Sequence, residues 1–314
     1  MTTGVTVAVV GAPGTAPQLG KKGTSSDLTL YNSVRDGHAI TLVEPTQFPE
    51  KFSPLLVTLT MAHHALLVVE TLSRAVAETI ATLELVDVPT TIVLGGSVGD
   101  AELTRALKGG RLESAPRLPL DLPRLREAIE ARRAPAAPGP VQVPIDHAFP
   151  VKGVGSVALG VVRQGTLRVH DKLRLWPSPT LVEVRSIQVH DIDRKDAESG
   201  ERVGLALKGV EADELSRGQI LAPPGALLEG ATLVGGPLAR CRYYRGNADA
   251  GARLNVVAGL QSAPAILESA SAEGVRIAAD RPLVFAPDTP AYLLDLSVGA
   301  GPRIVGRTLL RSPA

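Results

Sequence analysis

The pattern of apolar and polar positions differs between the first part of the chain and the rest, and this change divides the chain into regions. In the first part, continuous apolar runs such as Val5–Val10, Ala65–Val69 and Thr90–Leu94 alternate with helix-like segments. Such runs are typical of strands buried on both faces of a parallel sheet. Leu72–Leu85 has apolar residues at helical spacing and predicts a helix that covers the sheet. Residues 1–134 are therefore expected to form an α/β sheet with right-handed crossovers.

A hairpin and three further helices complete this first part. Leu28–Tyr31 and Ala39–Val43 flank Arg35-Asp36-Gly37 and predict two antiparallel strands joined by a turn. The helix expected at Leu122–Arg132 follows Asp121, whose carboxylate can cap its first turn. Two shorter helices are predicted over Leu55–Ala62 and Ala101–Lys108.

The period changes after a Pro- and Ala-rich stretch at residues 135–140. Proline favours extended backbone, so this stretch predicts a semi-rigid linker between domains. Residues 141–225 then alternate between β-branched runs and Gly, Asp or Pro, which is typical of a small antiparallel barrel. Residues 226–314 repeat this pattern and predict a second antiparallel β-barrel. The strand-like runs of the first barrel are Val157–Val162, Lys172–Leu175, Val182–Val189 and Val203–Leu207.

Composition narrows the possible classes of function. The 314 residues suffice for two or three domains, and a 44% hydrophobic share indicates a globular chain. A net charge of +1 excludes a polycation, so any nucleic-acid surface would be a local patch. The single cysteine, Cys241, excludes an internal disulfide and a cysteine-built zinc site. We expect a cytoplasmic monomer without a signal peptide, membrane span or DNA partner.

Several short motifs of the middle segment occur in a characteristic order. They include Pro144-Ile145-Asp146, Gly153–Gly160, Ser199–Gly204 and Arg217–Leu221. In this order they resemble domain II of the translational GTPases that deliver aminoacyl-tRNA, namely elongation factor Tu, its archaeal counterpart and SelB. The resemblance implies a P-loop-GTPase-like α/β domain followed by two β-barrels. It also implies a translation factor whose partners are the ribosome, tRNA or both.

The phosphate-binding loop of that family is degenerate in this sequence. Such a loop follows the first strand, and its backbone N–H groups, a Lys and a Ser or Thr hydroxyl hold the phosphates and Mg²⁺. Here Pro13 and Pro17 flank Gly14 and remove two amide donors. Gly20 and Lys21 resemble the loop's Gly-Lys pair but come too late, and Lys22 replaces the hydroxyl residue.

The two later GTPase elements are also missing at their expected places. Glu44 follows the strand at Ile40–Val43, but Gln47 stands where the family has Gly and Phe48 where it has the catalytic His. A Phe ring cannot orient a water by hydrogen bonding. Gly95-Gly96-Ser97-Val98 follows the strand expected at Thr90–Leu94, in place of the guanine-reading Asn-Lys-x-Asp. We therefore predict a pseudo-GTPase without nucleotide cofactor, catalytic residue or metal.

Candidate RNA contacts lie in three segments, and each has a structural alternative. Lysines and hydroxyls after Leu19 suit phosphate oxygens, or belong to a solvated loop. Phe149 could stack on a base, although we expect a core aromatic. The Arg-Tyr-Tyr-Arg cluster at residues 242–245 could meet RNA, or form a strand with one buried Tyr. The candidates are Lys21, Lys22, Ser25, Ser26, Asp146, His147, Phe149, Lys152, Arg163, Lys172, Arg242, Tyr243, Tyr244 and Arg245.

Three functions remain open from the sequence. The first is an elongation-factor-like protein that has lost GTP binding and hydrolysis and binds the ribosome, tRNA or both. The second is a nucleotide-binding factor that uses GTP and Mg²⁺ through the displaced Gly20-Lys21 loop. The third is a scaffold for a protein partner. The adjacent His63 and His64 are expected to be satisfied structural histidines rather than metal ligands.

Overall fold

The computed structural model describes residues 3–35, 37–96 and 98–312. Asp36 of the predicted turn and Ser97 after the Thr90–Leu94 strand lie outside these residues. The chain divides into two compact units. The first consists of Met1–Ala134, Cys241–Arg245 and Ser297–Ile304, and the second of Pro135–Arg240, Gly246–Leu296 and Val305–Ala314.

The first unit is built on a mixed seven-stranded sheet with the strand order β2-β3-β4-β1-β5-β6-β7. Strand β1 pairs in parallel with β4 and β5, and β5, β6 and β7 continue the parallel pairing. The antiparallel hairpin of β3 and β4 confirms the expected pair of strands. The strands are β1 (Thr3–Gly11), β2 (Lys21–Ser25), β3 (Thr29–Arg35), β4 (His38–Glu44), β5 (His64–Val69), β6 (Thr90–Leu94) and β7 (Arg117–Pro119).

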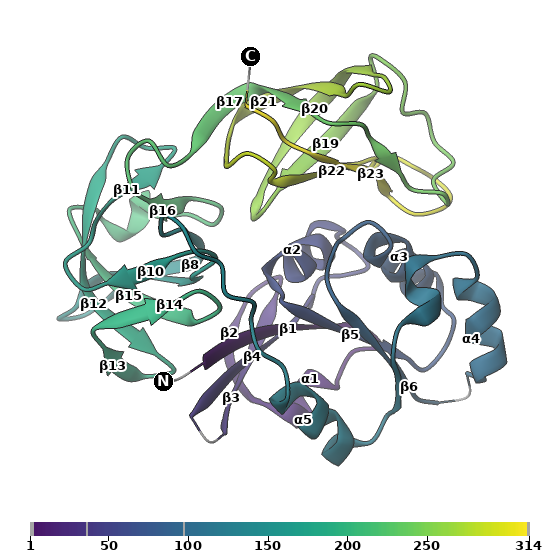
Figure 1. Cartoon of the computed structure of the whole chain (residues 1–314), viewed down its shortest axis with the longest axis horizontal. Coiled ribbons are helices and arrows are strands. Elements are labelled where there is room, and N and C mark those ends of the chain that lie inside the picture. The colour runs from purple at the N-terminus through teal and green to yellow at the C-terminus, as the bar shows by residue number, and fades with distance from the viewer. Residues whose placement is uncertain (1–2, 36, 97, 313–314) are drawn as a thin grey trace. The chain divides into compact units, whose positions relative to one another are not determined.

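Helices cover both faces of this sheet (Figure 1). Val5, Val7 and Val9 of β1 are buried with Leu125 and Ile129, so one face of β1 packs beneath α5. Figure 1 shows α1 on the same side as α5, and α2 and α3 on the other side. The helices are α1 (Ala16–Leu19), α2 (Ser53–Met61), α3 (Arg74–Leu83), α4 (Asp100–Leu107) and α5 (Leu122–Glu130), with a 3-10 turn at Arg111–Ser114.

Side-chain caps decide where two of these helices begin. The Ser73 hydroxyl accepts a hydrogen bond from the Val76 N–H at 3.2 Å, so α3 starts at Arg74. Asp121 accepts from the Arg124 N–H at 3.0 Å, as the sequence predicted for α5. The polar segment after Leu19 is not a loop, because Lys21–Ser25 pairs with β3 at the edge of the sheet. That expectation was wrong, and the pairing explains why: a neighbouring strand overrides a weak local preference.

The middle of the second unit is a closed antiparallel barrel. Its strand order is β11-β16-β8-β9-β15-β12-β13, and an additional pairing of β11 with β12 closes it. Its core includes Val143, Leu173, Val184 and Leu205. The strands are β8 (Val143–Val151), β9 (Gly155–Val161), β11 (Lys172–Trp176), β12 (Leu181–Val189), β13 (Ile192–Arg194), β15 (Arg202–Lys208) and β16 (Ile220–Ala222), with β10 (Thr166–Arg168) paired to β14 (Asp196–Glu198).

A second antiparallel sheet follows, with the strand order β17-β21-β20-β19-β22-β23-β18. An isolated bridge between Gly235 and Leu310 joins its first strand to the segment after β23, so it is only partly closed. Strand β18 ends at Arg240, and the following segment, Cys241–Arg245, belongs to the first unit. The strands are β17 (Leu228–Gly235), β18 (Ala239–Arg240), β19 (Arg253–Ala258), β20 (Gln261–Ala270), β21 (Val275–Phe285), β22 (Pro290–Leu294) and β23 (Ile304–Leu309).

The Pro- and Ala-rich segment at residues 135–140 lies along the barrel. The Ala137 N–H donates to the Ser199 hydroxyl at 3.1 Å, and the Gly165 N–H donates to the Ala137 carbonyl at 2.8 Å.

Across residues 3–35, 37–96 and 98–312, no helix has the length and apolar character needed to cross a membrane. The predicted fold class, an α/β domain with two antiparallel barrel-type sheets, is thereby confirmed.

Candidate functional site

The turn after β1 stands where a phosphate-binding loop would lie, and it is tied down by the chain itself. Gly11 has a φ of +97°, and a Cβ there would lie 2.1 Å from the Val68 carbonyl oxygen. The Ala12 N–H donates to the same carbonyl at 2.9 Å. The Gln18 amide donates to the Gly14 carbonyl at 2.9 Å, and Arg126 of α5 donates to the Gln18 carbonyl at 2.7 Å.

A backbone N–H of this turn donates its hydrogen bond to a carboxylate of the chain. The Gly14 N–H donates to Oε1 of Glu44 at 3.0 Å, and the Tyr31 hydroxyl lies 3.5 Å from Oε2. Burial raises the pKa of Glu44, while the Gly14 and Tyr31 hydrogen bonds act in the opposite direction. The Glu44 carboxylate therefore accepts a backbone N–H, that of Gly14, of the kind that binds a phosphate in a phosphate-binding loop.

The helix that follows this turn is a poor anion site. Helix α1 contains only Ala16–Leu19, with a proline in its first two positions. One turn aligns too few peptide dipoles to give a useful macrodipole. Gly20 ends this helix in an extended conformation, and Lys21 continues directly into β2, opposite Asn32. The displaced Gly20-Lys21 pair thus leads into a strand that begins at Lys21, not into the helix that a phosphate-binding loop requires.

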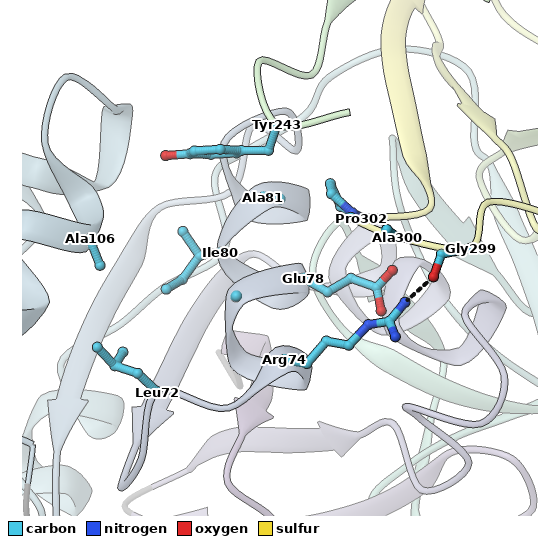
Figure 2. A pocket seen from close by; sticks show the side chains of 12 residues that line it. Leu72, Arg74, Glu78, Ile80, Ala81, Ala106, Tyr243, Gly299, Ala300 and Pro302 are labelled. Atoms are coloured by element: carbon cyan, nitrogen blue, oxygen red, sulfur yellow. Dashed lines mark hydrogen bonds between the residues drawn. The ribbon is translucent and has the colours of Figure 1, made fainter. Parts of the chain in front are cut away.

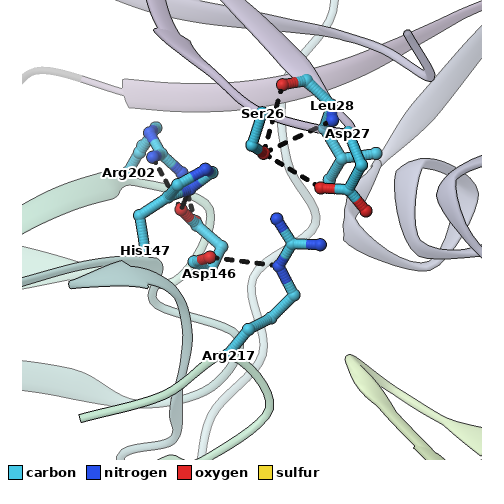
Figure 3. Close-up of polar contacts among 7 residues, drawn as sticks. All are labelled: Ser26, Asp27, Leu28, Asp146, His147, Arg202 and Arg217. Atoms are coloured by element: carbon cyan, nitrogen blue, oxygen red, sulfur yellow. Dashed lines mark hydrogen bonds and ion pairs between the residues drawn. The ribbon is translucent and has the colours of Figure 1, made fainter. Parts of the chain in front are cut away.

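The second site is a cluster of charged side chains in the barrel. Asp146 of β8 is only 1% exposed and forms an ion pair with Arg202 of β15, whose Nη2 donates to Oδ1 at 2.9 Å. His147 Nδ1 donates to the same Oδ1 at 2.7 Å, and Arg217 Nε donates to the Asp146 carbonyl at 3.2 Å. Figure 3 shows Arg202, His147 and Arg217 around Asp146.

A break in the strand pairing lets these neighbours meet. The register of β8 against β9 shifts between Ile145 and His147. Such a bulge re-aims a side chain, and here the neighbouring side chains of Asp146 and His147 contact each other.

The electrostatics of this cluster are dominated by its cations. Burial alone would raise the pKa of Asp146, but the charge of Arg202 and hydrogen bonds from His147 and Arg202 hold it below its ordinary range. Burial and the charge of Arg202 also lower the pKa of His190. The cluster therefore gathers two guanidinium groups and an imidazole around one buried acid, whose ionised form Arg202 and His147 stabilise.

The other barrel candidates are scattered. Phe149 is 40% exposed, so the expectation of a core aromatic was wrong; the side chain lies near the end of β8, beyond the barrel core. Lys152 and Lys172 are exposed. Arg163 is partly buried, and desolvation lowers the pKa of its guanidinium, so it is the least suited of the four to contact RNA.

The candidates of the first unit form two groups. Lys21, Lys22 and Ser25 line the exposed edge strand, with Ser26 directly after it. The Arg-Tyr-Tyr-Arg cluster is a turn, in which the Arg242 guanidinium lies 4.6 Å from the centroid of the Tyr243 ring. Tyr243 and Tyr244 are both partly exposed and the segment is not a strand, so the predicted strand with one buried Tyr was wrong. Tyr243 also lines a cavity of the first unit.

The histidine pair is satisfied internally. His63 Nδ1 accepts the Thr6 N–H at 3.1 Å, and His64 Nε2 pairs with the Thr91 hydroxyl at 3.0 Å. Burial lowers the pKa of His64 to about 4. Within the described part of the chain, no group of three or more His, Cys, Asp or Glu side chains could hold a metal ion.

Sequence reasoning missed Arg202 and Arg217 as site residues. Both lie in motifs that had been used only to identify the barrel, Ser199–Gly204 and Arg217–Leu221. The signal was an arginine at the start of a largely apolar strand: Arg202 lies on the face of β15 opposite the core residues Val203 and Leu205, yet its side chain is only 10% exposed, so it needs a partner. The sequence offers no means of assigning Asp146 as that partner, 56 residues earlier.

Comparisons with known proteins agree with this architecture. The family model of elongation factor Tu domain 2 matches residues 155–222. An uncharacterized protein of Methanocaldococcus jannaschii is 33% identical over 306 residues, which cover 96% of this chain and 98% of that protein. The selenocysteine-specific elongation factor of the same organism is 31% identical over 227 residues, or 64% of this chain. That match covers 48% of the factor, so the aligned region is about half of its length.

A solved structure shows the same fold over nearly the whole chain. Translation elongation factor SelB from Methanococcus maripaludis, crystallised with the GTP analogue GppNHp, superposes with a TM-score of 0.85. The superposition covers 99% of this chain and 79% of that one at 19% sequence identity. At this level of identity the match establishes the fold and not the activity.

Proposed function

We propose that this chain, whose sequence and fold are similar to those of elongation factor Tu and SelB, is a member of their translational GTPase family that works without a nucleotide. It binds tRNA, the ribosome or both through its barrel and does not hydrolyse GTP. The hydrogen bond from the Gly14 N–H to the Glu44 carboxylate is the observation that carries this proposal.

Glu44 argues against nucleotide binding for two reasons. Its carboxylate takes up the donor of the turn, and its negative charge repels a phosphate brought to the same place. Pro13 and Pro17 supply no N–H to replace that donor. A phosphate that bound at this turn would therefore have to displace the Glu44 carboxylate, and few backbone N–H groups would be available to hold it.

The geometry of the displaced Gly-Lys pair gives no support to the alternative of an unusual nucleotide loop. Lys21 is exposed on an edge strand, and Gly20 is extended. A Lys that reaches β- and γ-phosphates extends from the start of a helix, under a loop of backbone donors. Lys21 lies neither at the start of a helix nor under a loop of backbone donors.

The charged cluster of the barrel is the proposed contact for the end of a tRNA. Arg202 and His147 donate hydrogen bonds to the Asp146 carboxylate, and Arg217 donates to the Asp146 backbone carbonyl, so three basic side chains gather at one residue. One relative is named as a selenocysteine-specific elongation factor. A selenol is more acidic than a thiol and is largely an anion at neutral pH, so this cluster is chemically suited to such a side chain. Selenocysteyl-tRNA is therefore the first RNA to test.

A nucleotide titration tests the proposal most directly. A fluorescent GTP analogue is titrated with the full chain in the presence and absence of Mg²⁺. We expect no saturable binding at micromolar concentrations. Micromolar binding that requires Mg²⁺ contradicts the proposal and returns the chain to the nucleotide-dependent members of its family.

RNA binding is tested by filter binding of one tRNA carrying either selenocysteine or serine, over a series of salt concentrations. We expect binding that weakens with salt, because phosphate contacts release counterions. His147→Ala is expected to reduce the preference between the two aminoacyl groups, and Lys152→Ala to weaken both equally. Binding that is flat in salt, or absent, would instead favour the protein-partner scaffold.

A further inference from the structure

The segment that follows β4, residues 45–52, is held by an ion pair from elsewhere in the first unit. Glu78 of α3 is 7% exposed. Arg303 donates to it three times: from its N–H to Oε1 at 2.8 Å, from Nε to Oε1 at 3.0 Å and from Nη2 to Oε2 at 2.6 Å. This two-pronged geometry is among the strongest that a guanidinium and a carboxylate can form.

The same guanidinium also holds the segment itself. Nη2 of Arg303 donates to the Pro49 carbonyl at 2.9 Å. The guanidinium carbon lies 5.2 Å from the ring centroid of Phe52 and 6.0 Å from that of Phe48, within range of cation–π attraction. One arginine therefore connects α3 to the backbone and both aromatic rings of residues 45–52.

The start of the segment is fixed independently. Glu44, which precedes it, accepts the Gly14 N–H, and the Gln47 N–H donates to the Asp27 carbonyl at 3.1 Å. In a nucleotide switch, the corresponding segment is ordered by contacts to the γ-phosphate and Mg²⁺ and is released on hydrolysis. Here groups of the chain itself make the ordering contacts at both ends.

We propose that the Arg303–Glu78 pair is an internal latch that holds residues 45–52 in one conformation without a nucleotide. The inference rests on the proposed function and extends it to regulation. Residues 45–52 keep one conformation because the charged groups that order them, Arg303 and Glu78, are part of the chain and cannot dissociate as a nucleotide does. The latch needs Arg rather than Lys, since an ammonium cannot bridge the carboxylate, the Pro49 carbonyl and the two rings together.

Helix α3 also offers a matched control. Figure 2 shows Arg74 and Glu78 beside a cavity of about 480 Å³, which Leu72, Ile80 and Tyr243 also line. Arg74 Nη2 donates to the Gly299 carbonyl at 3.4 Å, so this arginine joins the same helix to the same returning segment, Ser297–Ile304. Its hydrogen bond to Gly299 does not involve residues 45–52, unlike the bond from Arg303 Nη2 to the Pro49 carbonyl.

The test is hydrogen–deuterium exchange of the full chain, followed by mass spectrometry. We expect amides of residues 45–52 to exchange faster by about tenfold or more in Arg303→Met, Arg303→Lys and Glu78→Gln, because each change leaves a buried charge unpaired or poorly held. Peptides from β1 and β5 should be unchanged, and Arg74→Met should behave as the unmodified protein. GTP with Mg²⁺ should leave residues 45–52 unaffected.

Three results would overturn the latch. They are unchanged exchange at residues 45–52 in Arg303→Met, equal acceleration across the whole first unit, or slower exchange of residues 45–52 when GTP and Mg²⁺ are added to the unmodified protein. Failure of the proposed function is separable from these. Nucleotide that binds in the fluorescence titration without changing exchange contradicts nucleotide independence and leaves the latch standing.

Discussion

Glu44 is a half-buried acid and Asp146 a fully buried one, and the two differ in the charge of their neighbours. Glu44 faces a backbone N–H and a phenol, and its burial raises its pKa. Asp146 is more deeply buried, yet the charge of Arg202 and the hydrogen bonds around it lower its pKa. In the first unit the acid accepts hydrogen bonds from neutral donors. In the barrel the acid is surrounded by Arg202, His147 and Arg217.

The largest effect is expected from removing the charge of the barrel acid. Asp146→Asn leaves the Arg202 guanidinium buried beside a neutral group, which typically costs about 3–5 kcal/mol. Urea unfolding of the full chain measures this loss. Glu268→Gln breaks the exposed Arg276–Glu268 pair and serves as the control, with a change of about 1 kcal/mol or less. Equal losses in both variants would show that the barrel pair is not special.

The pH dependence of stability should follow from the same acid. Because the folded-state pKa of Asp146 is lowered, its contribution is present above its unfolded pKa of about 3.9 and is lost as pH falls through the folded value. The difference in unfolding free energy between the unmodified protein and Asp146→Asn should therefore be constant near neutrality. It should shrink progressively below about pH 4. A difference that is unchanged at acid pH would mean that packing, not charge, causes the loss.

The contrast between the two units also shows what sequence patterns can specify. Continuous apolar strands, the capping Asp121 and the β-branched runs of the barrel depend on local preference and burial, and the fold followed from them. The edge strand Lys21–Ser25 did not, because polar residues with a glycine become a strand only by pairing with β3. Cys241–Arg245 likewise leaves its expected strand because the segment packs with a different unit.

The sites were less predictable than the fold for a related reason. The sequence motifs singled out the turn at Gly14, since a proline or an absent lysine is visible in the sequence. The hydrogen bond from Gly14 to Glu44 spans 30 positions, and the Asp146–Arg202 pair spans 56. Both depend on strand register, which local patterns leave undetermined.

A moderate effect is expected at the edge strand if it contacts RNA. Lys21→Ala with Lys22→Ala removes two exposed cations from β2 without disturbing a core position. If both contact phosphates, the dependence of log affinity on log salt should fall by about two, and stability should be unchanged. Lys108→Ala, an exposed lysine after α4, is the control. A salt dependence that is unaffected by the double change assigns these lysines to solubility alone.

The smallest effect is expected at Glu44, and its sign separates the two acids. Gln keeps an oxygen for the Gly14 N–H but removes a charge that burial disfavours, so Glu44→Gln should leave stability at pH 7 unchanged or slightly raised. Because the folded-state pKa of Glu44 is raised, its contribution is fully present below its unfolded pKa of about 4.3 and is lost as pH rises through the folded value. The unmodified protein should therefore gain on Glu44→Gln in acid, opposite to the trend at Asp146. Glu44→Ala removes the acceptor and should be less stable than Glu44→Gln, as measured in the same urea series. If Gln costs as much as Ala, the charge itself holds the turn, and the acid is then a closer substitute for a phosphate than its hydrogen bond alone would make it.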